Sequence, residues 1–126
     1  MKYIFIAAGG VVGALLRYGV SGFTYKYVSG IFPWGTLAVN LSGCFLMGLL
    51  WAVSERLALP ESFKPFVFVG ILGAFTTFST FALETFQLLR DREIKIALFN
   101  MLASNILGIA FLIAGFVIAK TLLGKG

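Results

Sequence analysis

Four long uncharged runs dominate the pattern of hydrophobic and polar positions along this chain. They cover residues 3–16, 27–54, 65–83 and 96–119 and contain no Asp, Glu, Lys or Arg. A helix needs about 20 apolar residues to cross the hydrocarbon core of a bilayer. The last three runs reach this length alone, and the first reaches it if the helix passes through Arg17. The pattern therefore predicts an all-α integral membrane protein with four transmembrane helices.

Residues that start or end helices separate the runs. Pro33 suits the first turn of the second helix, and Ser62 suits the N-cap of the third. The first run does not end in a small-x-small cleavage site, so we expect a retained span rather than a signal peptide. We predict a single transmembrane domain. It covers residues 1–126, with spans at about 3–27, 33–56, 63–89 and 95–123.

Glycines within the first two spans predict close helix packing. Gly9 and Gly13 form a GxxxG pair in the first span, and small residues at this spacing let helix backbones approach each other. Gly35, Gly43 and Gly48 predict the same for the second span.

The composition narrows the classes of function. Of 126 residues, 60% are hydrophobic and only 12% are charged, which fits a membrane protein and not a soluble domain. The chain has no His, one Cys and five acidic residues, so we expect neither an enzyme nor a transition-metal site. The net charge of +5 comes from basic residues at the helix ends, which favours anchoring to lipid headgroups over a nucleic-acid partner.

The basic residues divide evenly between the two predicted sides of the membrane, with five on each side. The positive-inside rule needs a bias to fix orientation, so we predict insertion both ways up and an antiparallel two-fold dimer. A boundary error that hides a real bias stays an alternative. Since four short helices enclose little volume, a pathway is expected between subunits. The two sets are Lys2, Arg56, Lys64, Lys120 and Lys125, and Arg17, Lys26, Arg90, Arg92 and Lys95.

The third span carries an unusual polar segment, GAFTTFSTF, at residues 73–81. Four hydroxyls fall at positions 76–80, after Gly70 and Gly73. In one interpretation, these hydroxyls bond to carbonyls of the preceding turn and hold helices together. In the other, the helix breaks near residues 73–77, which would free carbonyls for a hard cation and amides for an anion.

Aromatic, amide and charged side chains offer anion ligands in the same region. Phe78 and Phe81 can turn their positive ring edges to a common interface, with core packing as the alternative. Asn40, near the middle of the second span, offers an amide donor or a helix–helix hydrogen bond. Glu84 is the only acid well inside a span, and Arg17 is its basic counterpart. Intramembrane ionisable groups are usually functional, so Arg17 is expected to draw an anion into a vestibule.

The fourth span has a polar face at four-residue spacing. Asn100, Ser104 and Gly108 share this face, and Asn105 lies beside them. Together with Thr80 they predict a track of hydroxyl and amide donors, and linings rich in donors favour anions.

Two segments resemble the Fluc-type fluoride channels, also called the CrcB family. They are WGTLAVN at 34–40 and GAFTTFSTFALE at 73–84, and GALLRY at 13–18 supports them. The likeness covers nearly the whole chain, and TTFSTF within a third span is its most specific part. The resemblance implies a dual-topology antiparallel homodimer with a broken third helix. It also implies two separate fluoride pathways along the dimer interface.

The resemblance assigns a pore asparagine, a pair of phenylalanine rings whose edges approach fluoride, and hydroxyls that line the path. The fourth-helix track departs from the family, in which hydroxyl or ring residues are usual at the places of Asn100, Ser104 and Gly108. The implied pore residues are Asn40, Thr77, Phe78, Thr80, Phe81 and Ser104.

The resemblance further implies a cation site and a vestibule. Backbone carbonyls of Gly73 and Thr76 from both subunits would hold a central structural sodium ion. Arg17 would match a vestibule arginine, Thr36 a threonine near the pore mouth, and Glu84 a glutamate of the third helix.

The expected function is passive electrodiffusion of fluoride out of the cytoplasm, across the cell (inner) membrane, to relieve fluoride toxicity. Hydrogen fluoride enters acidified cells and dissociates, and the membrane potential drives the anion out. Two alternatives stay open. One is a small proton-coupled multidrug exporter of dual topology, although such exporters use a Glu in the first span, which has no acid here. The other is a structural membrane subunit, which would not need GAFTTFSTF.

Overall fold

The computed structural model describes residues 1–124, and every regular element in that range is helical. The first two passes are α1 (Lys2–Tyr27) and α2 (Trp34–Arg56), and the last is α5 (Ile94–Leu122). The third pass consists of three pieces. They are the π-helix η1 (Pro65–Leu72), the short α3 (Gly73–Phe75) and α4 (Phe78–Arg90).

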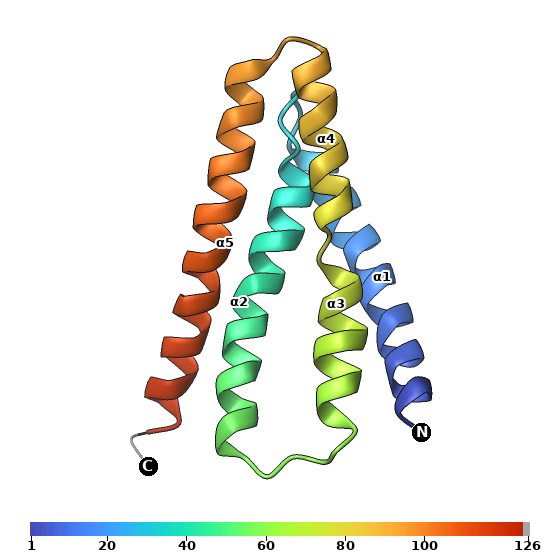
Figure 1. Ribbon diagram of the computed structural model, residues 1–126, viewed down its shortest axis with the longest axis vertical. Helices are drawn as coiled ribbons and strands as arrows, with labels where there is room; N and C mark the ends of the chain where they lie inside the picture. Colours follow the sequence, from blue (N-terminus) through green and yellow to red (C-terminus); the bar gives the residue numbers. More distant parts are fainter. Residues whose placement is uncertain (125–126) are drawn as a thin grey trace.

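Four antiparallel passes make up the molecule (Figure 1). The N-terminus, the connection between α2 and η1, and the end of α5 lie at one end. The connections from α1 to α2 and from α4 to α5 lie at the other. Each pass has the length and hydropathy needed to cross a membrane. The prediction of an all-α fold with four membrane-spanning helices is confirmed.

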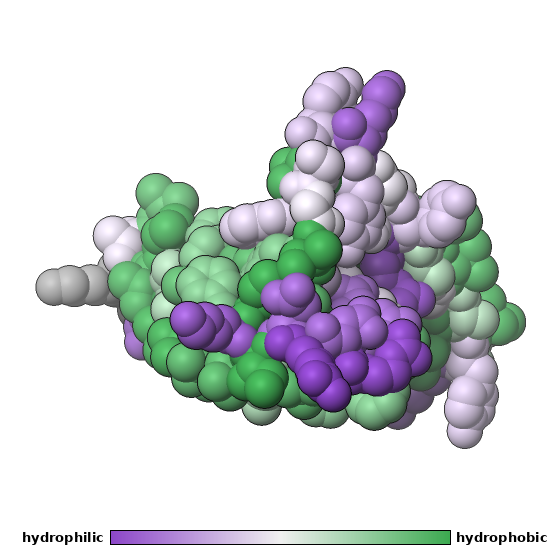
Figure 2. Space-filling view, turned by 90° about the horizontal axis from the view of Figure 1, so that it is seen from above, coloured by the Kyte–Doolittle hydropathy of each residue, from purple (hydrophilic) through white to green (hydrophobic). Residues whose placement is uncertain are grey.

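Large apolar side chains cover the outside of the bundle. On α5, for example, Ile106 is 62% exposed and Ile109 is 65% exposed. Figure 2, which views the end with the α4–α5 connection, shows hydrophilic residues gathered at that end and hydrophobic residues around them. Because lipid tails solvate such side chains and water does not, this distribution suits a bilayer.

Glycines bring α1 against the third pass, as the GxxxG pair predicted. The Cα of Gly9 lies next to Gly70, where an added methyl group would meet it at 2.9 Å. A methyl group at Gly13 would overlap the carbonyl oxygen of Ile71. The small residues therefore permit backbone contact between α1 and η1.

A second glycine contact joins α2 to α5. A methyl group at Gly48 would overlap the carbonyl oxygen of Leu112, and one at Gly115 would overlap that of Phe45. The obstructing atoms belong to the backbone and cannot turn aside, so the two helices need glycine at both positions.

The third pass loses helical geometry in its middle. Thr76 has φ −80° and ψ 156°, and Thr77 has φ −148° and ψ 122°, so both residues are extended. Figure 1 shows the ribbon straightening between α3 and α4. The extended residues divide the third pass into two helical halves at mid-length.

The α2–α5 contact generates a prediction about stability. Gly48→Ala is expected to lower the free energy of unfolding by about 1–3 kcal/mol, because the methyl group forces the two backbones apart. Gly19→Ala on α1 is the matched control, since nothing lies within 4 Å of the added carbon. It is expected to be neutral or to stabilise by up to about 1 kcal/mol through helix propensity. Thermal unfolding in detergent measures both, and equal effects would contradict the packing argument.

Candidate functional site

Thr76 and Thr77, the extended residues between α3 and α4, are called the interruption of the third pass. Asn40 on α2 holds this interruption through two hydrogen bonds. Its Nδ2 donates to the carbonyl oxygen of Thr77 (2.9 Å), and its Oδ1 accepts from the amide of Thr77 (2.8 Å). A side-chain amide has the same donor and acceptor pair as a peptide group. Asn40 therefore pairs with Thr77 as the peptide group of a neighbouring strand would. The second N–H of its Nδ2 stays available to the surroundings. We expected Asn40 to offer an amide donor or to make a helix–helix hydrogen bond. The structure shows that it bonds the extended main chain of Thr77.

The interruption leaves main-chain carbonyls of the preceding turn without their helical donors. In a continuous helix the amide of Thr77 would donate to Gly73, and the amide of Thr80 would donate to Thr76. The amide of Thr77 bonds Asn40 instead, and the amide of Thr80 bonds Oγ1 of Thr77 (3.2 Å). The carbonyls of Gly73 and Thr76 therefore lose their helical donors at mid-membrane.

Thr77 also caps the second half of the pass. Its hydroxyl oxygen accepts from the amide of Thr80, and its hydroxyl donates to Oγ1 of Thr80 (3.0 Å). The N-terminus of α4 consequently faces the interruption. A helix N-terminus carries partial positive charge and free amide donors, so it favours an anion.

A cavity of about 290 Å³ opens beside the interruption, between α2, α4 and α5. We call it the phenylalanine cavity. Five of the six predicted pore residues line it, so the fold brings together an amide, hydroxyls and phenyl rings from three helices. These five are Asn40, Thr77, Phe78, Phe81 and Ser104.

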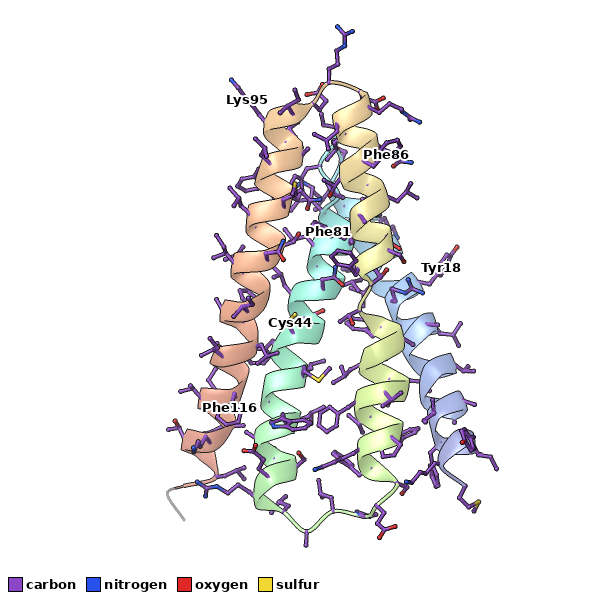
Figure 3. The ribbon with its side chains drawn as sticks, in the orientation of Figure 1. Tyr18, Cys44, Phe81, Phe86, Lys95 and Phe116 are labelled. Atoms are coloured by element: carbon purple, nitrogen blue, oxygen red, sulfur yellow. The ribbon has the colours of Figure 1, made fainter. Side chains whose placement is uncertain are left out.

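The two rings of this cavity differ in exposure. The ring centroids of Phe78 and Phe81 are 5.7 Å apart, and the planes meet at 54°. Phe81 is 8% exposed, whereas Phe78 is 76% exposed. Figure 3 shows Phe81 pointing from α4 towards α2, whereas Phe86 points away from the other helices. Phe81 is thus part of the core, and Phe78 stands at the open rim of the cavity.

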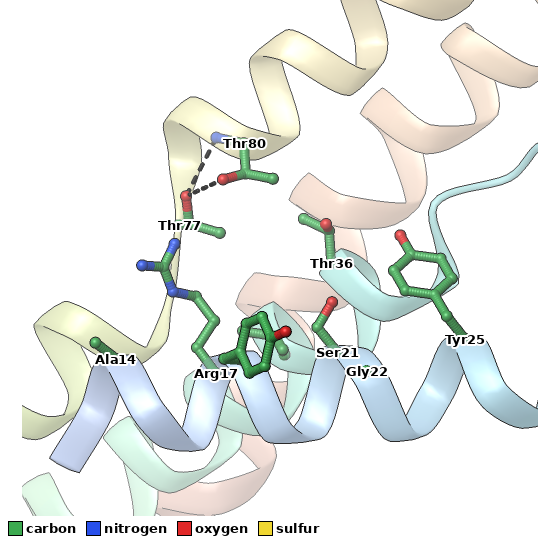
Figure 4. A pocket seen from close by; sticks show the side chains of 10 residues that line it. Ala14, Arg17, Ser21, Gly22, Tyr25, Thr36, Thr77 and Thr80 are labelled. Atoms are coloured by element: carbon green, nitrogen blue, oxygen red, sulfur yellow. Dashed lines mark hydrogen bonds between the residues drawn. The ribbon is translucent and has the colours of Figure 1, made fainter. Parts of the chain in front are cut away.

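A second cavity, of about 530 Å³, lies on the other side of the interruption and is called the arginine cavity. It contains Arg17 from α1, Thr36 from α2, and both Thr77 and Thr80 (Figure 4). The guanidinium of Arg17 reaches from α1 towards Thr77. Thr80 therefore lines the arginine cavity and not the phenylalanine cavity, although it bonds Thr77. Thr77 lines both cavities and forms the wall that they share.

Glu84 lies one turn beyond Thr80 and contacts the rim of the arginine cavity. Its Oε1 accepts a hydrogen bond of 2.5 Å from the hydroxyl of Thr36. Its Oε2 is buried without a partner among residues 1–124. Glu84 also lines a third cavity, of about 370 Å³, together with Asp91 and Glu93.

Only part of the polar track predicted on the fourth helix lines a cavity. Ser104 and Asn105 line the phenylalanine cavity, but the cavity wall does not include Asn100 or Gly108. Asn100 is 1% exposed and donates from Nδ2 to Oγ1 of Thr85 (3.1 Å). Sequence reasoning did not single out Thr85, although its spacing of four from Phe81 places both on one face of α4.

Comparisons with known proteins identify the family of this chain. The family profile described as "CrcB-like protein, Camphor Resistance (CrcB)" matches residues 4–116. A protein of Magnetococcus marinus named "Fluoride-specific ion channel FluC" is 47% identical over 121 residues, which cover 95% of this chain and 98% of the relative. Proteins of the same name from Desulforapulum autotrophicum and Salinibacter ruber are 46% and 44% identical, over 94% and 98% of this chain and 96% and 93% of their own lengths. The chain therefore belongs to the CrcB family, and its four apolar helices make it a multi-pass membrane protein.

Proposed function

We propose that this chain forms a fluoride-selective channel. The observation that carries the proposal is the phenylalanine cavity, where amide and hydroxyl groups meet two phenyl rings at the interruption of the third pass. Relatives that cover nearly the whole chain bear the name of fluoride-specific ion channels, which supports the same function. A channel needs no covalent chemistry from its side chains, so the proposal includes no enzymatic activity.

The proposed pathway runs past Asn40, Phe78 and Phe81. Fluoride is small and strongly hydrated, so a site that accepts it must replace water with closely set donors. The free N–H of Asn40 is one such donor, and the positive edges of the two rings add weaker attraction. Thr77 and Ser104 line the same cavity. A narrow, rigid lining of this kind excludes the larger chloride ion.

The arginine cavity is proposed as the vestibule of that pathway. Arg17 supplies a positive charge that concentrates anions, because water-exposed clefts lined by one sign of charge raise the local density of counter-ions. Thr36, Thr80 and Glu84 stand where the vestibule approaches Thr77. We assign Thr36 and Glu84 to the mouth of the pore and Thr80 to the wall of the vestibule next to Thr77.

The pathway is proposed to be completed by a second, antiparallel copy of the chain, with one pore on each side of the dimer. Phe78 is largely exposed in one chain, and Gly73 is also exposed. A pore residue left open to lipid would not hold an anion, so this supports a partner surface over Phe78. The even division of basic residues supports insertion both ways up, in the cell membrane.

A structural sodium ion is proposed on the axis of that dimer. The carbonyls of Gly73 and Thr76 have lost their helical donors, and oxygen ligands suit a hard cation. Two carbonyls from each of two chains would supply four ligands. The residues present therefore fit the ion, which would stabilise the paired interruptions.

The proposed cellular role is passive export of fluoride to relieve its toxicity. Hydrogen fluoride crosses membranes, dissociates in a less acidic cytoplasm, and leaves fluoride trapped there as an anion. A membrane potential that is negative inside drives the anion outward through a selective pore without any coupled ion.

The proposal is tested by fluoride efflux from proteoliposomes loaded with potassium fluoride. Valinomycin sets the voltage, a fluoride electrode reads the flux, and chloride-loaded vesicles serve as the control. Rapid efflux of fluoride without efflux of chloride is the expected result. Efflux driven by a pH gradient alone, with no voltage-driven efflux, would contradict a passive channel and favour a proton-coupled exporter.

The site assignment predicts the effect of three substitutions on this efflux. Phe78→Ile and Phe81→Ile are each expected to slow it by about tenfold, through loss of the ring edges. Asn40→Asp is expected to slow it by about a thousandfold or more, because a carboxylate near the path repels the anion. Ser62→Asp adds the same charge at the start of the third pass, outside the phenylalanine cavity, the arginine cavity and the cavity of Glu84, and is expected to have little effect. Normal efflux in all three pore variants would disprove the assignment.

The sodium proposal predicts ion-specific stabilisation. Raising sodium at constant ionic strength, with potassium as the replaced ion, is expected to raise the midpoint of thermal unfolding of the purified protein. The free energy of unfolding is expected to rise by about 2.7 kcal/mol when the sodium concentration is 100 times the dissociation constant of the ion. Midpoints that do not distinguish sodium from potassium would argue against the site.

A further inference from the structure

A buried hydrogen-bond relay joins α5 to α4 beside the phenylalanine cavity. The hydroxyl of Ser104 donates to Oδ1 of Asn100 (3.2 Å), and Nδ2 of Asn100 donates to Oγ1 of Thr85 (3.1 Å). The hydroxyl of Thr85 donates in turn to the main-chain carbonyl of Phe81 (2.8 Å). Thr85 and Asn100 are 7% and 1% exposed, so the middle of the relay is closed off. Its two ends, Ser104 and Phe81, line the cavity.

The direction of these bonds gives Ser104 the wrong polarity for an anion. Its proton points to Asn100, so its oxygen presents lone pairs to the cavity. An anion in the cavity needs the proton instead. If Ser104 alone turned, the buried Oδ1 of Asn100 would lose the one donor that it has among residues 1–124, and a buried acceptor without a partner is unfavourable.

Rotation of the Asn100 amide by half a turn removes this difficulty. The oxygen and the NH₂ group of an amide occupy nearly the same space, so the rotated side chain fits the same site. Nδ2 then donates to the oxygen of Ser104, and Oδ1 accepts from the hydroxyl of Thr85. The carbonyl of Phe81 keeps its bond from the main-chain amide of Thr85, four residues on. Every buried group stays paired, and the proton of Ser104 is released towards the cavity.

We propose that Asn100 is a positioning residue that switches Ser104 between accepting and donating towards the phenylalanine cavity. Thr85 supports both states because a hydroxyl both donates and accepts. The inference rests on the proposed fluoride function and names a residue that does not line the cavity itself. With water in the cavity Ser104 accepts, and with fluoride there it donates.

The test is a double-mutant cycle on fluoride efflux with Asn100→Leu and Ser104→Ala. Leucine has the branching and the number of side-chain heavy atoms of asparagine but larger methyl groups, so folding is expected to persist with a lower stability. Ser104→Ala is expected to slow efflux by about tenfold, since one hydrogen bond to the anion is lost. Asn100→Leu is expected to slow it similarly, because without Nδ2 to hold its proton towards the cavity the Ser104 hydroxyl donates to the main-chain carbonyl of position 100, one turn earlier. The double variant is expected to be no slower than Ser104→Ala, because Asn100 acts through Ser104. Losses that multiply to about a hundredfold would overturn the switch.

A second measurement does not depend on flux. In wild-type protein labelled with ¹⁵N, the side-chain amide signals of Asn100 are expected to shift when fluoride is added and not when chloride is added. Ser104→Ala should abolish the shift, and Thr85→Ser, which keeps the hydroxyl, should preserve it. An Asn100 signal that fluoride leaves unmoved would overturn the switch even if Asn100→Leu failed to fold.

The two proposals fail in different ways. A wild-type protein without voltage-driven fluoride efflux would overturn the fluoride channel and the switch with it. Normal wild-type efflux together with multiplying losses, or with an unmoved Asn100 signal, would overturn the switch alone.

Discussion

The pair of hydrogen bonds between Asn40 and the backbone of Thr77 is the interaction on which the rest of the site depends. Extended residues inside a membrane expose main-chain groups that lipid cannot satisfy. Asn40 satisfies the amide and the carbonyl of Thr77 together, at 2.8 and 2.9 Å. Because the amide of Thr77 bonds Asn40, it does not bond the carbonyl of Gly73. A new helix, α4, then begins at Phe78. One side chain therefore maintains the interruption that separates the two cavities.

This pair of bonds requires that α2 lie very close to the third pass. Gly43 stands one turn after Asn40, and a methyl group there would overlap the side chain of Thr76. The ring of Phe75 lies 3.2 Å from the same position. Glycine at position 43 thus lets the amide of Asn40 reach the backbone of its target. The contacts of Gly9 and Gly13 with η1 hold the other side of the third pass in place.

The sequence allowed the four passes and the glycine contacts to be predicted, because both depend on local patterns of residue type. The set of Asn40, Phe78, Phe81 and Ser104 was expected from the family resemblance, and helical spacing supported only the pairing of Phe78 with Phe81. The partner of Asn40 could not be read in this way, since Thr77 lies 37 residues away and contributes only its backbone. The place of Thr80 in the arginine cavity likewise depends on how α4 turns after the interruption.

The backbone nature of this contact has a consequence for how the family can vary. Asn40 bonds the amide and carbonyl of Thr77, which every residue except proline possesses, and does not bond its side chain. Position 77 can therefore change among residues that still cap α4, such as Thr, Ser, Asn and Asp, without loss of its bonds to Asn40, whereas position 40 needs a planar amide of this length. Since residue 77 lines both cavities, such a change would alter the lining while the architecture stays fixed.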